Sequence, residues 1–220
     1  MTLLKKTKRD VVSEFRCEEI LGAARKVFAR KGFDGASVDD IAETAGLAKG
    51  TVYVYFHSKR ELYLAVLKRG IATLMEETKR SVGAAATTGD KVRAFIATRM
   101  RYAEKNQDFI AIHHTEFGRI HPDCLSKELK NLYLEQTQAI AVVLEEAVRQ
   151  GEIHLLSPDA AAYLIYEMTR ALIGRRLLGW SRASVEEDIH LLFELIWNGL
   201  AGSGEPACPE EAACIVPGQC

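Results

Sequence analysis

Apolar residues recur every three to four positions along most of this chain, and no segment alternates apolar and polar residues as a half-buried strand does. Such a period places the apolar side chains on one face of a helix. We therefore expect an all-α protein of about nine helices. Their approximate ranges are residues 10–31, 37–45, 48–55, 58–80, 90–106, 108–119, 126–150, 158–178 and 184–199.

Several of these predicted helices begin at residues that cap exposed backbone N–H groups. Ser58–Glu61 and Ser184–Glu187 have the spacing of capping boxes, in which each side chain bonds the other residue's backbone. Ser157-Pro158 supplies an N-cap followed by proline at the first helical position. We expect Asp90 to cap the helix that follows a small, polar loop over residues 81–89.

Residues 37–61 contain two short predicted helices joined by a tight turn at Gly46. The first opens with Ser37 and Asp40, spaced as in a capping box, and has apolar residues along one face. The second, from Ala48 to Tyr55, carries no acidic residue that would repel phosphate. This arrangement predicts a helix-turn-helix, which places its second helix in the major groove of DNA.

The run IAETAGLAKGTVYVYFHSKRELYLAVL closely resembles the DNA-binding signature of the TetR-like transcriptional regulators. The preceding run, EEILGAARKVFARKGFDGASVDDIA, also resembles that family, and the resemblance covers roughly residues 14–70. It implies an N-terminal three-helix DNA-binding domain and a larger helical domain for effector binding and dimerisation. We expect the DNA-binding domain over residues 1–57, the helical domain over 58–200 and a flexible tail with three cysteines over 201–220.

The expected DNA contacts lie on and around the second helix of the motif. Hydroxyls, a cation and a glycine suit contact with phosphates and base edges. The resemblance implies that a lysine at the start of the next helix binds phosphate, and that Phe56 packs inward. Val54 stands where the family usually has a polar residue, so the operator sequence cannot be transferred from relatives. The expected contacts are Ser37, Lys49, Gly50, Thr51, Tyr53, Tyr55, His57 and Lys59.

The charge of the chain is distributed unevenly. Residues 1–80 hold 16 Lys and Arg against 11 Asp and Glu, a net charge of +5, whereas the remainder carries −6 and the whole chain −1. A basic front and an acidic back would orient the molecule toward a polyanion. The asymmetry agrees with double-stranded DNA, in an operator expected to be palindromic, as the partner.

A small-molecule effector and the role of repressor are implied by the family resemblance. Aromatic side chains with a few polar groups among residues 90–180 suit an amphiphilic or aromatic effector, and they equally suit an ordinary core. Arg170 would either bind an acidic effector or pair with Glu167. The pocket candidates are Tyr102, Phe109, His113, Phe117, Tyr133, Tyr163, Tyr166 and Arg170.

Two groups of residues could alternatively bind a metal ion. Histidines, carboxylates and a thiol occur within residues 113–124, although neighbouring His113 and His114 point about 100° apart on a helix. Cys208, Cys214 and Cys220 are six residues apart, which matches neither a zinc knuckle nor a redox C-x-x-C motif. We expect no metal site and no cofactor, and keep a metal- or thiol-responsive regulator and an effector-independent DNA-binding protein as alternatives.

The last two predicted helices carry apolar stripes that would form a four-helix bundle with a second copy of the chain. The expected homodimer contacts are Leu172, Ile189, Phe193 and Ile196. Alternatively, the same stripe packs within one copy of the chain and completes its core. In that case Leu191 and Leu195 offer a second apolar face.

The sequence gives no indication of an enzyme or of a membrane protein. It contains no Gly-rich phosphate loop, HExxH motif, nucleophile elbow or C-x-x-C motif. No secretory signal and no apolar run of the roughly 18–20 residues that span a bilayer are visible. We therefore expect a cytoplasmic transcriptional regulator.

Overall fold

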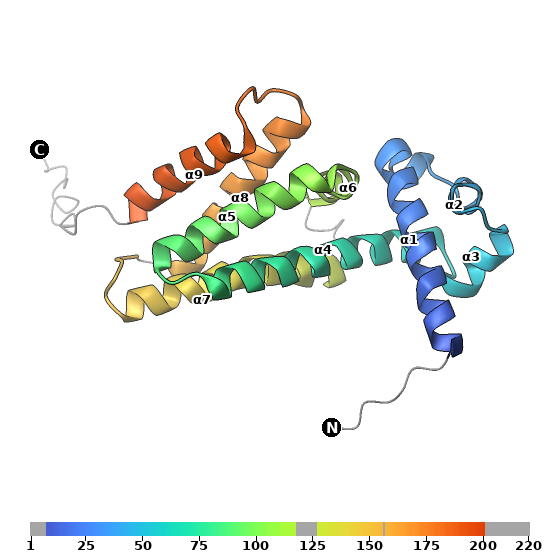
Figure 1. Ribbon diagram of the computed structural model, residues 1–220, viewed down its shortest axis with the longest axis horizontal. Helices are drawn as coiled ribbons and strands as arrows, with labels where there is room; N and C mark the ends of the chain where they lie inside the picture. Colours follow the sequence, from blue (N-terminus) through green and yellow to red (C-terminus); the bar gives the residue numbers. More distant parts are fainter. Residues whose placement is uncertain (1–7, 118–126, 156, 201–220) are drawn as a thin grey trace, which may run out of the picture.

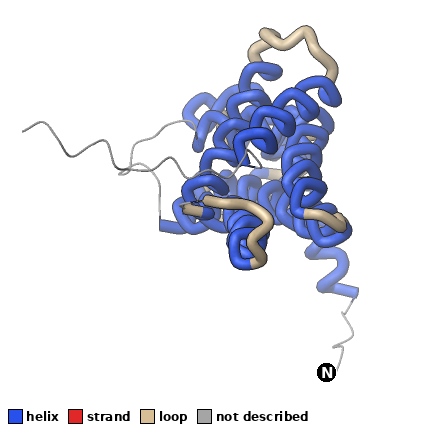
Figure 2. Tube along the Cα trace, turned by 90° about the vertical axis from the view of Figure 1, so that its left-hand side faces the viewer, coloured by secondary structure: helices blue, strands red, loops and turns tan. Residues whose placement is uncertain are grey.

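The computed structural model describes residues 8–117, 127–155 and 157–200 (Figure 1). Over these residues the chain forms nine helices joined by short loops, with no strand, which confirms the predicted all-α fold (Figure 2). The helices are α1 (Lys8–Gly35), α2 (Val38–Ala45), α3 (Lys49–Tyr55), α4 (Lys59–Ala84), α5 (Thr88–Lys105), α6 (Gln107–Phe117), α7 (Lys127–Arg149), α8 (Pro158–Leu177) and α9 (Val185–Leu200).

Helices α1, α2 and α3 gather at one end of the molecule, and α5 to α9 form a bundle at the other (Figure 1). The long helix α4 joins the two parts, because it packs against α1 as well as against α5, α6 and α7. Helix α6 also packs against α1. The predicted boundary between residues 57 and 58 falls in the loop before α4, and the division into two domains stays a prediction because α4 contributes to both parts.

Two of the predicted helix starts are formed as expected, and a third is formed only in part. Ser184 and Glu187 make a complete capping box, with the Ser184 N–H donating to the Glu187 carboxylate at 2.7 Å. At Ser58 only half of the predicted capping box is present: the Ser58 hydroxyl accepts from the Glu61 N–H at 3.1 Å, but the Glu61 carboxylate accepts from the His57 N–H. Ser157 Oγ accepts from the Ala160 N–H, and Pro158 is the first residue of α8.

The start of α5 corrects the expectation for Asp90. The N-cap is Thr87, whose hydroxyl oxygen accepts the Asp90 N–H at 3.1 Å. Asp90 is the third helical residue, and its carboxylate accepts from the same threonine hydroxyl. Because α4 also continues to Ala84, the loop predicted over residues 81–89 is only three residues long.

Helix α1 is interrupted near its C-terminal end by Gly32. This residue has φ 70° and ψ 176°, a backbone conformation that L side chains rarely adopt. The regular helix therefore ends where the sequence predicts, at Lys31, and a further short turn leads to Gly35.

One continuous apolar core runs from α1 to α9. Its largest fully buried side chains include Phe28 at the α1 end and Phe95, Phe109 and Tyr166 in the bundle. Burying a side chain of this size contributes about 1.5–3 kcal/mol, so packing of these faces supplies most of the stabilisation. None of the described helices is both long and apolar enough to cross a bilayer.

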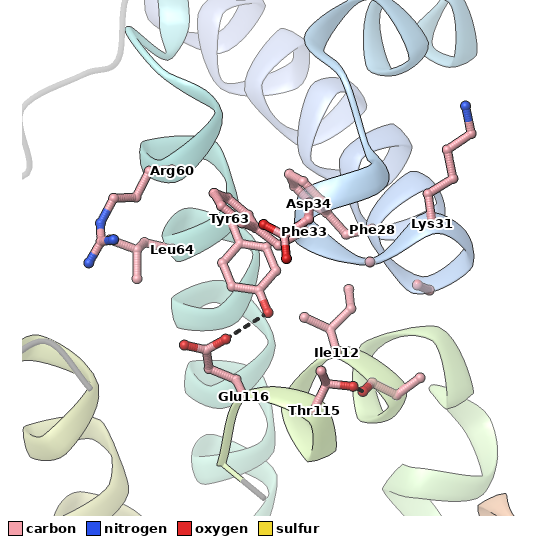
Figure 3. A pocket seen from close by; sticks show the side chains of 13 residues that line it. Phe28, Lys31, Phe33, Asp34, Arg60, Tyr63, Leu64, Ile112, Thr115 and Glu116 are labelled. Carbon is pink, nitrogen blue, oxygen red and sulfur yellow. Dashed lines mark hydrogen bonds between the residues drawn. The ribbon is translucent and has the colours of Figure 1, made fainter. Parts of the chain in front are cut away.

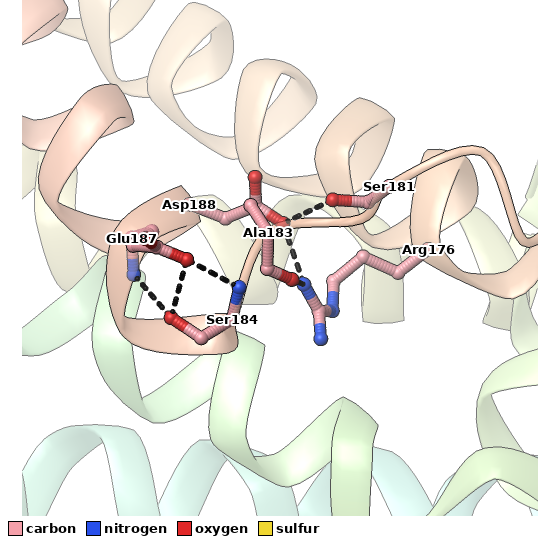
Figure 4. Close-up of polar contacts among 6 residues, drawn as sticks. All are labelled: Arg176, Ser181, Ala183, Ser184, Glu187 and Asp188. Carbon is pink, nitrogen blue, oxygen red and sulfur yellow. Dashed lines mark hydrogen bonds and ion pairs between the residues drawn. The ribbon is translucent and has the colours of Figure 1, made fainter.

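A buried ion pair fixes the connection between α8 and α9 (Figure 4). The Arg176 guanidinium donates to the Asp188 carboxylate at 2.7 Å and to the Ala183 carbonyl at 2.8 Å. Ser181 Oγ donates to the same carboxylate at 3.0 Å. The Asp188 side chain is only 2% exposed, and these three donated bonds hold the last two helices at a defined angle.

Candidate functional site

The helix-turn-helix is formed by α2 and α3. Ser37 and Asp40 make a complete capping box at the start of α2, with Ser37 Oγ accepting from the Asp40 N–H at 3.1 Å. The Asp40 carboxylate also accepts from Lys31 of α1 at 2.7 Å, and this bond together with those from Ser37 lowers its pKa to about 2. These contacts tie the start of α2 to α1.

The turn between α2 and α3 depends on Gly46, which adopts the left-handed conformation with φ 66° and ψ 32°. Its N–H donates to Glu43, and the Leu47 N–H donates to the Ala42 carbonyl at 2.9 Å. Both bonds satisfy carbonyl groups at the end of α2. The half-buried Leu47 side chain then packs against the core.

Helix α3 presents one face to the core and the other to solvent. Val52 is 1% exposed, and Phe56 directly after the helix is 9% exposed, so the expectation that Phe56 packs inward is confirmed. On the outer face Tyr53 is 41% and Val54 74% exposed. Of the expected DNA contacts, Lys49 and Gly50 also lie exposed, whereas Thr51 and Tyr55 are partly covered.

Lys49 is held by a carboxylate of the supporting helix. Its Nζ donates to Asp39 Oδ2 at 2.8 Å, and both side chains are at least half exposed. This hydrogen bond raises the pKa of Lys49. A phosphate would therefore compete with Asp39 for the ammonium group, a relationship that the spacing of the two residues in the sequence did not indicate.

The position of Lys59 corrects its expected role as a phosphate ligand. Its ammonium group turns back toward the end of α1, donating to the Phe33 carbonyl at 2.8 Å and the Ala36 carbonyl at 3.0 Å. It also lies 4.5 Å from the centroid of the Phe33 ring. With the Asp34 carbonyl at 3.4 Å, three carbonyls and a ring face surround the cation, so Lys59 joins α4 to the end of α1.

The remaining two expected contacts lie near the ends of the motif. Ser37 is half-buried and serves as the N-cap, while its hydroxyl hydrogen is a separate donor. His57 is exposed in the loop after α3, and its backbone N–H donates to the Glu61 carboxylate at 2.7 Å. Both remain predicted DNA contacts.

A cavity of about 350 Å³ lies where α1, α4 and α6 meet (Figure 3). Its aromatic wall consists of Phe28, Phe33 and Tyr63, whose ring centroids lie 5.0–6.3 Å apart. The Tyr63 hydroxyl donates to Glu116 Oε2 at 3.0 Å and so connects α4 to α6. This junction lies between the helix-turn-helix and the bundle.

The structure brings together four of the eight pocket candidates. Tyr102, Phe109, His113 and Tyr166 are each at most 5% exposed and lie in the core of the bundle. Tyr102 and Phe109 make an edge contact at 6.0 Å, and Phe109 lies 5.7 Å from the His113 ring.

Two of the other four candidates are placed differently. Tyr163 is 45% exposed and does not face the interior. Arg170 is half-buried and donates to the Glu167 carboxylate at 2.8 Å. Of the two roles expected for Arg170, the structure shows pairing with Glu167 within α8. The side chains of Phe117 and Tyr133 lie outside the described residues.

Two further polar residues of the bundle core, Arg99 and Gln136, were not among the candidates, although they are only 3% and 2% exposed. The sequence pattern could have indicated that Arg99 is buried, because it lies on the apolar face of α5, one turn after Phe95 and Ile96. The same pattern exists for Gln136, which lies on α7 one turn after Leu132 and one turn before Ile140.

No group of three or more His, Cys, Asp or Glu side chains suited to a metal ion occurs among the residues that the structure describes. His121, Asp123 and Cys124, and the tail with Cys208, Cys214 and Cys220, lie outside them. Cys17 of α1 is partly buried, and burial raises the pKa of its thiol.

The expected dimer contacts are placed differently from the prediction. Ile189 and Ile196 are 1% and 7% exposed and pack in the core of the protomer, while Leu172 and Phe193 are partly buried. Ile189 and Ile196 are therefore covered within the protomer, while Leu172 and Phe193 stay predicted dimer contacts. The exposed apolar side chains of α8, α9 and their connection, which we call the α8–α9 face, are instead Tyr163, Leu164, Leu177, Leu178, Trp180, Leu191 and Leu195.

Residues 20–66 match the family model of bacterial regulatory proteins, tetR family. The HTH-type transcriptional activator FasR of Mycolicibacterium smegmatis is 36% identical over 78 residues, which make up 36% of each chain. This alignment spans little more than a third of FasR. The HTH-type transcriptional repressor KstR2 of the same species is 26% identical over 157 residues, covering 70% of this chain and 74% of KstR2.

Solved structures share the fold over most of the chain. The transcriptional regulator FadR from Bacillus subtilis, solved in complex with stearoyl-CoA, superposes with a TM-score of 0.76 at 20% identity, covering 83% of this chain and 98% of FadR. FadR from Bacillus halodurans superposes with a TM-score of 0.75 at 17% identity, with the same coverage. At these identities the likeness shows the fold. Residues 20–66 therefore carry the DNA-binding domain of the tetR family of bacterial regulatory proteins, in a chain that shares the fold of FadR.

Proposed function

We propose that this protein is a cytoplasmic, homodimeric transcriptional regulator that binds a palindromic operator and leaves it when a small molecule binds to the bundle. Repression is the mode of action proposed here, as in KstR2 and in the HTH-type transcriptional repressor NicS of Pseudomonas putida, which is 27% identical over 142 residues. FasR is a transcriptional activator, so the sign of regulation needs its own test.

The observation that carries this proposal is the outer face of α3. Lys49, Gly50 and Tyr53 lie exposed on it, while Val52 and Phe56 anchor the helix to its support. The glycine permits close approach of the backbone, and the cation and phenol supply donors for phosphates and base edges. The bonds at Ser37 and Gly46 hold the supporting helix in place, so α3 would enter the groove as a preformed element.

Dimerisation through the α8–α9 face supports the proposal of a palindromic operator. Large exposed apolar groups on neighbouring helices mark a protein interface more often than free surface. A two-fold dimer through α8 and α9 would form a four-helix bundle with the two α3 helices at its far ends. Such heads read half-sites spaced by about one helical turn, ~34–36 Å, or a multiple of it.

DNA binding is tested by selecting duplexes from a random pool with the purified protein and measuring affinity for the selected site by gel shift. Replacing Lys49 and Tyr53 together by Ala should abolish specific binding and leave the circular dichroism spectrum unchanged, because both side chains are exposed. The control is Lys105→Ala at the exposed C-terminal end of α5, which removes one charge and should bind like the wild type. Full affinity of the double variant would contradict the role given to α3.

Effector release is tested on the same operator complex. FadR from Bacillus subtilis holds stearoyl-CoA, so stearoyl-CoA is the first probe. Release of DNA at a concentration that also raises the melting temperature would support a ligand-responsive regulator. If a broad panel of ligands changes neither property, an effector-independent DNA-binding protein becomes the better description.

A further inference from the structure

Four helices of the bundle each contribute one buried polar side chain to a common point. Arg99 of α5, His113 of α6, Gln136 of α7 and Tyr166 of α8 are exposed by 3%, 3%, 2% and 0%. We call these four residues the Gln136 cluster. Buried polar groups cost free energy unless they are well bonded, so four of them at one place suggest a use beyond packing.

Three potential donors of the Gln136 cluster converge on one amide oxygen. Gln136 Oε1 lies 3.4 Å from Arg99 Nη2, 3.4 Å from the Tyr166 hydroxyl and 3.2 Å from His113 Nε2. An amide oxygen offers two lone pairs, and strong hydrogen bonds are nearer 2.8–3.0 Å. The three long distances show an acceptor shared among more donors than it satisfies well.

The charge around this oxygen favours an anion over a neutral amide. The Arg99 guanidinium is always protonated, and its carbon lies 4.4 Å from the Tyr166 ring and 5.4 Å from the Phe95 ring. Burial, and next the charge of Arg99, lower the pKa of His113 to about 3, so the imidazole is neutral at pH 7. A carboxylate would accept stronger, charge-assisted bonds from these groups than the amide does.

A path leads from the Gln136 cluster toward the surface between α4 and α7. A small cavity of about 10 Å³ borders Arg99 and Gln136. It shares Met75, Glu135 and other lining residues with an open groove of about 460 Å³. That groove also presents Val82 and Val142, side chains suited to an apolar tail.

We propose that the Gln136 cluster binds the carboxylate of an apolar organic acid, and that the Gln136 amide oxygen occupies the position of a ligand oxygen until the acid enters. The acid's apolar part would lie in the groove between α4 and α7. This inference rests on the proposed function, since it names the chemical class of the effector. The thioester group of an acyl thioester is neutral and lacks the charge that Arg99 would pair with. The site would therefore bind a free acid more tightly than the corresponding thioester.

The Gln136 cluster lies beside the contact between the bundle and the helix that enters the DNA-binding part. His113 packs against Phe109, and the Phe109 ring lies directly against Gly70 of α4. A ligand that moves Gln136 and His113 would therefore act on α4 through a single intervening ring. The acid would shift the DNA-binding heads by as much as its affinities for the two arrangements differ.

The first test is direct binding of dodecanoate to the full protein by isothermal titration calorimetry, with 1-dodecanol as the matched neutral probe. We expect saturable binding of dodecanoate at least tenfold tighter than that of the alcohol. Arg99→Met should weaken dodecanoate binding roughly 10- to 100-fold, as loss of charge-assisted bonds implies, and leave dodecanol binding unchanged. Replacing a buried arginine by methionine is often tolerated, so this variant should fold.

The second test places the carboxylate in the protein itself. Gln136→Glu should raise the melting temperature by roughly 2–4 °C, because the new carboxylate pairs with Arg99, and should abolish dodecanoate binding. Asn131→Asp adds the same charge on an exposed position of α7 and is the control, expected to change neither property.

Equal affinity for acid and alcohol, absence of dodecanoate binding, or unaltered binding to the Arg99→Met variant would each overturn the inference. So would a lower melting temperature of the Gln136→Glu variant, because a burial cost would then exceed the pairing with Arg99. None of these measurements involves DNA, so they are independent of the test for operator binding. Failure of the wild type to select an operator would contradict the proposed function while leaving the binding data for dodecanoate intact.

Discussion

The Phe109 ring of α6 lies so close to Gly70 of α4 that a Cβ atom at Gly70 would meet three ring carbons at 2.2–2.7 Å. The Tyr102 hydroxyl donates to the Gly70 carbonyl at 3.2 Å. Phe109 is fully buried and cannot move aside without disturbing the core. Gly70 is therefore the point at which the bundle holds the helix that leads to the DNA-binding part.

Gly70→Ala should destabilise the protein, because the added methyl group forces α4 and α6 apart. Overpacking of this kind costs roughly 1–3 kcal/mol, which exceeds the gain of about 0.5–1 kcal/mol from replacing glycine within a helix. The free energy of unfolding in urea is the measurement. Gly22→Ala in α1 is the control, since nothing lies within 4 Å of its Cβ position and the gain in helix propensity should appear alone. Equal stabilisation of both variants would contradict the close contact.

Lys59→Met should lower stability without altering the electrostatics of DNA binding. The ammonium group bonds the Phe33 and Ala36 carbonyls, and hydrogen bonds to a charged group contribute about 1.5–3 kcal/mol. We expect this loss in urea denaturation and an unchanged slope of log affinity against log salt. A slope smaller by about one phosphate contact, with unchanged stability, would restore Lys59 as a phosphate ligand.

Asp39→Asn should strengthen binding to DNA of any sequence. The carboxylate holds Lys49 Nζ at 2.8 Å and would itself repel a phosphate near α3. Removing its charge releases the lysine and steepens the salt dependence of binding, while the exposed pair contributes little to folding. Gel shifts on unrelated duplexes at low and high salt measure the effect. The double variant with Lys49→Ala should lose the gain, whereas a gain that persists would point to another cation.

Leu191→Glu together with Leu195→Glu should produce monomers in sedimentation velocity experiments. These two side chains are 58% and 61% exposed and lie one turn apart on α9, within the α8–α9 face. Burying two carboxylates in an apolar interface is strongly unfavourable. Leu134→Glu, on α7 and 63% exposed, is the matched control and should leave the oligomeric state unchanged. A dimer that survives the double substitution would place the interface elsewhere.

Stability should fall as the pH drops from 6.5 toward 3, in part because of His113. Burial lowers the pKa of this histidine to about 3, below the 6.5 of an unfolded chain. The unfolded state therefore binds more protons across that window, and the stabilisation is complete only above pH 6.5. One such proton contributes a slope of up to about 1.4 kcal/mol per pH unit.

The measurement is urea denaturation between pH 4.5 and 7, above the range in which the carboxylate of Asp40 titrates with its pKa of about 2. His113→Gln should flatten the pH dependence by about one proton. The control is His154→Gln at an exposed position, which should retain the wild-type slope. An identical slope in the His113 variant would show that the histidine does not titrate as its burial implies.

The sequence by itself determined the secondary structure and the DNA-binding motif. Helical periodicity, the serine caps and Gly46 depend on spacings of two to four residues, and these local rules hold whatever the rest of the chain does. The predicted helices therefore agree with the described ones to within a few residues at most ends. The start of α5 differed because Thr87 and Asp90 are both capping residues, and backbone geometry alone selects between them.

Only the tertiary structure decided which side chains meet. Helix α9 has apolar residues on two faces, and packing against α5 buries Ile189 and Ile196 while leaving Leu191 and Leu195 exposed. Lys59 lies 23 residues from the Ala36 carbonyl that it bonds, and Arg99 lies 37 residues from Gln136. A periodic pattern records that a helix has an apolar face, but the neighbour of each side chain is set by how distant helices pack, which no local spacing encodes.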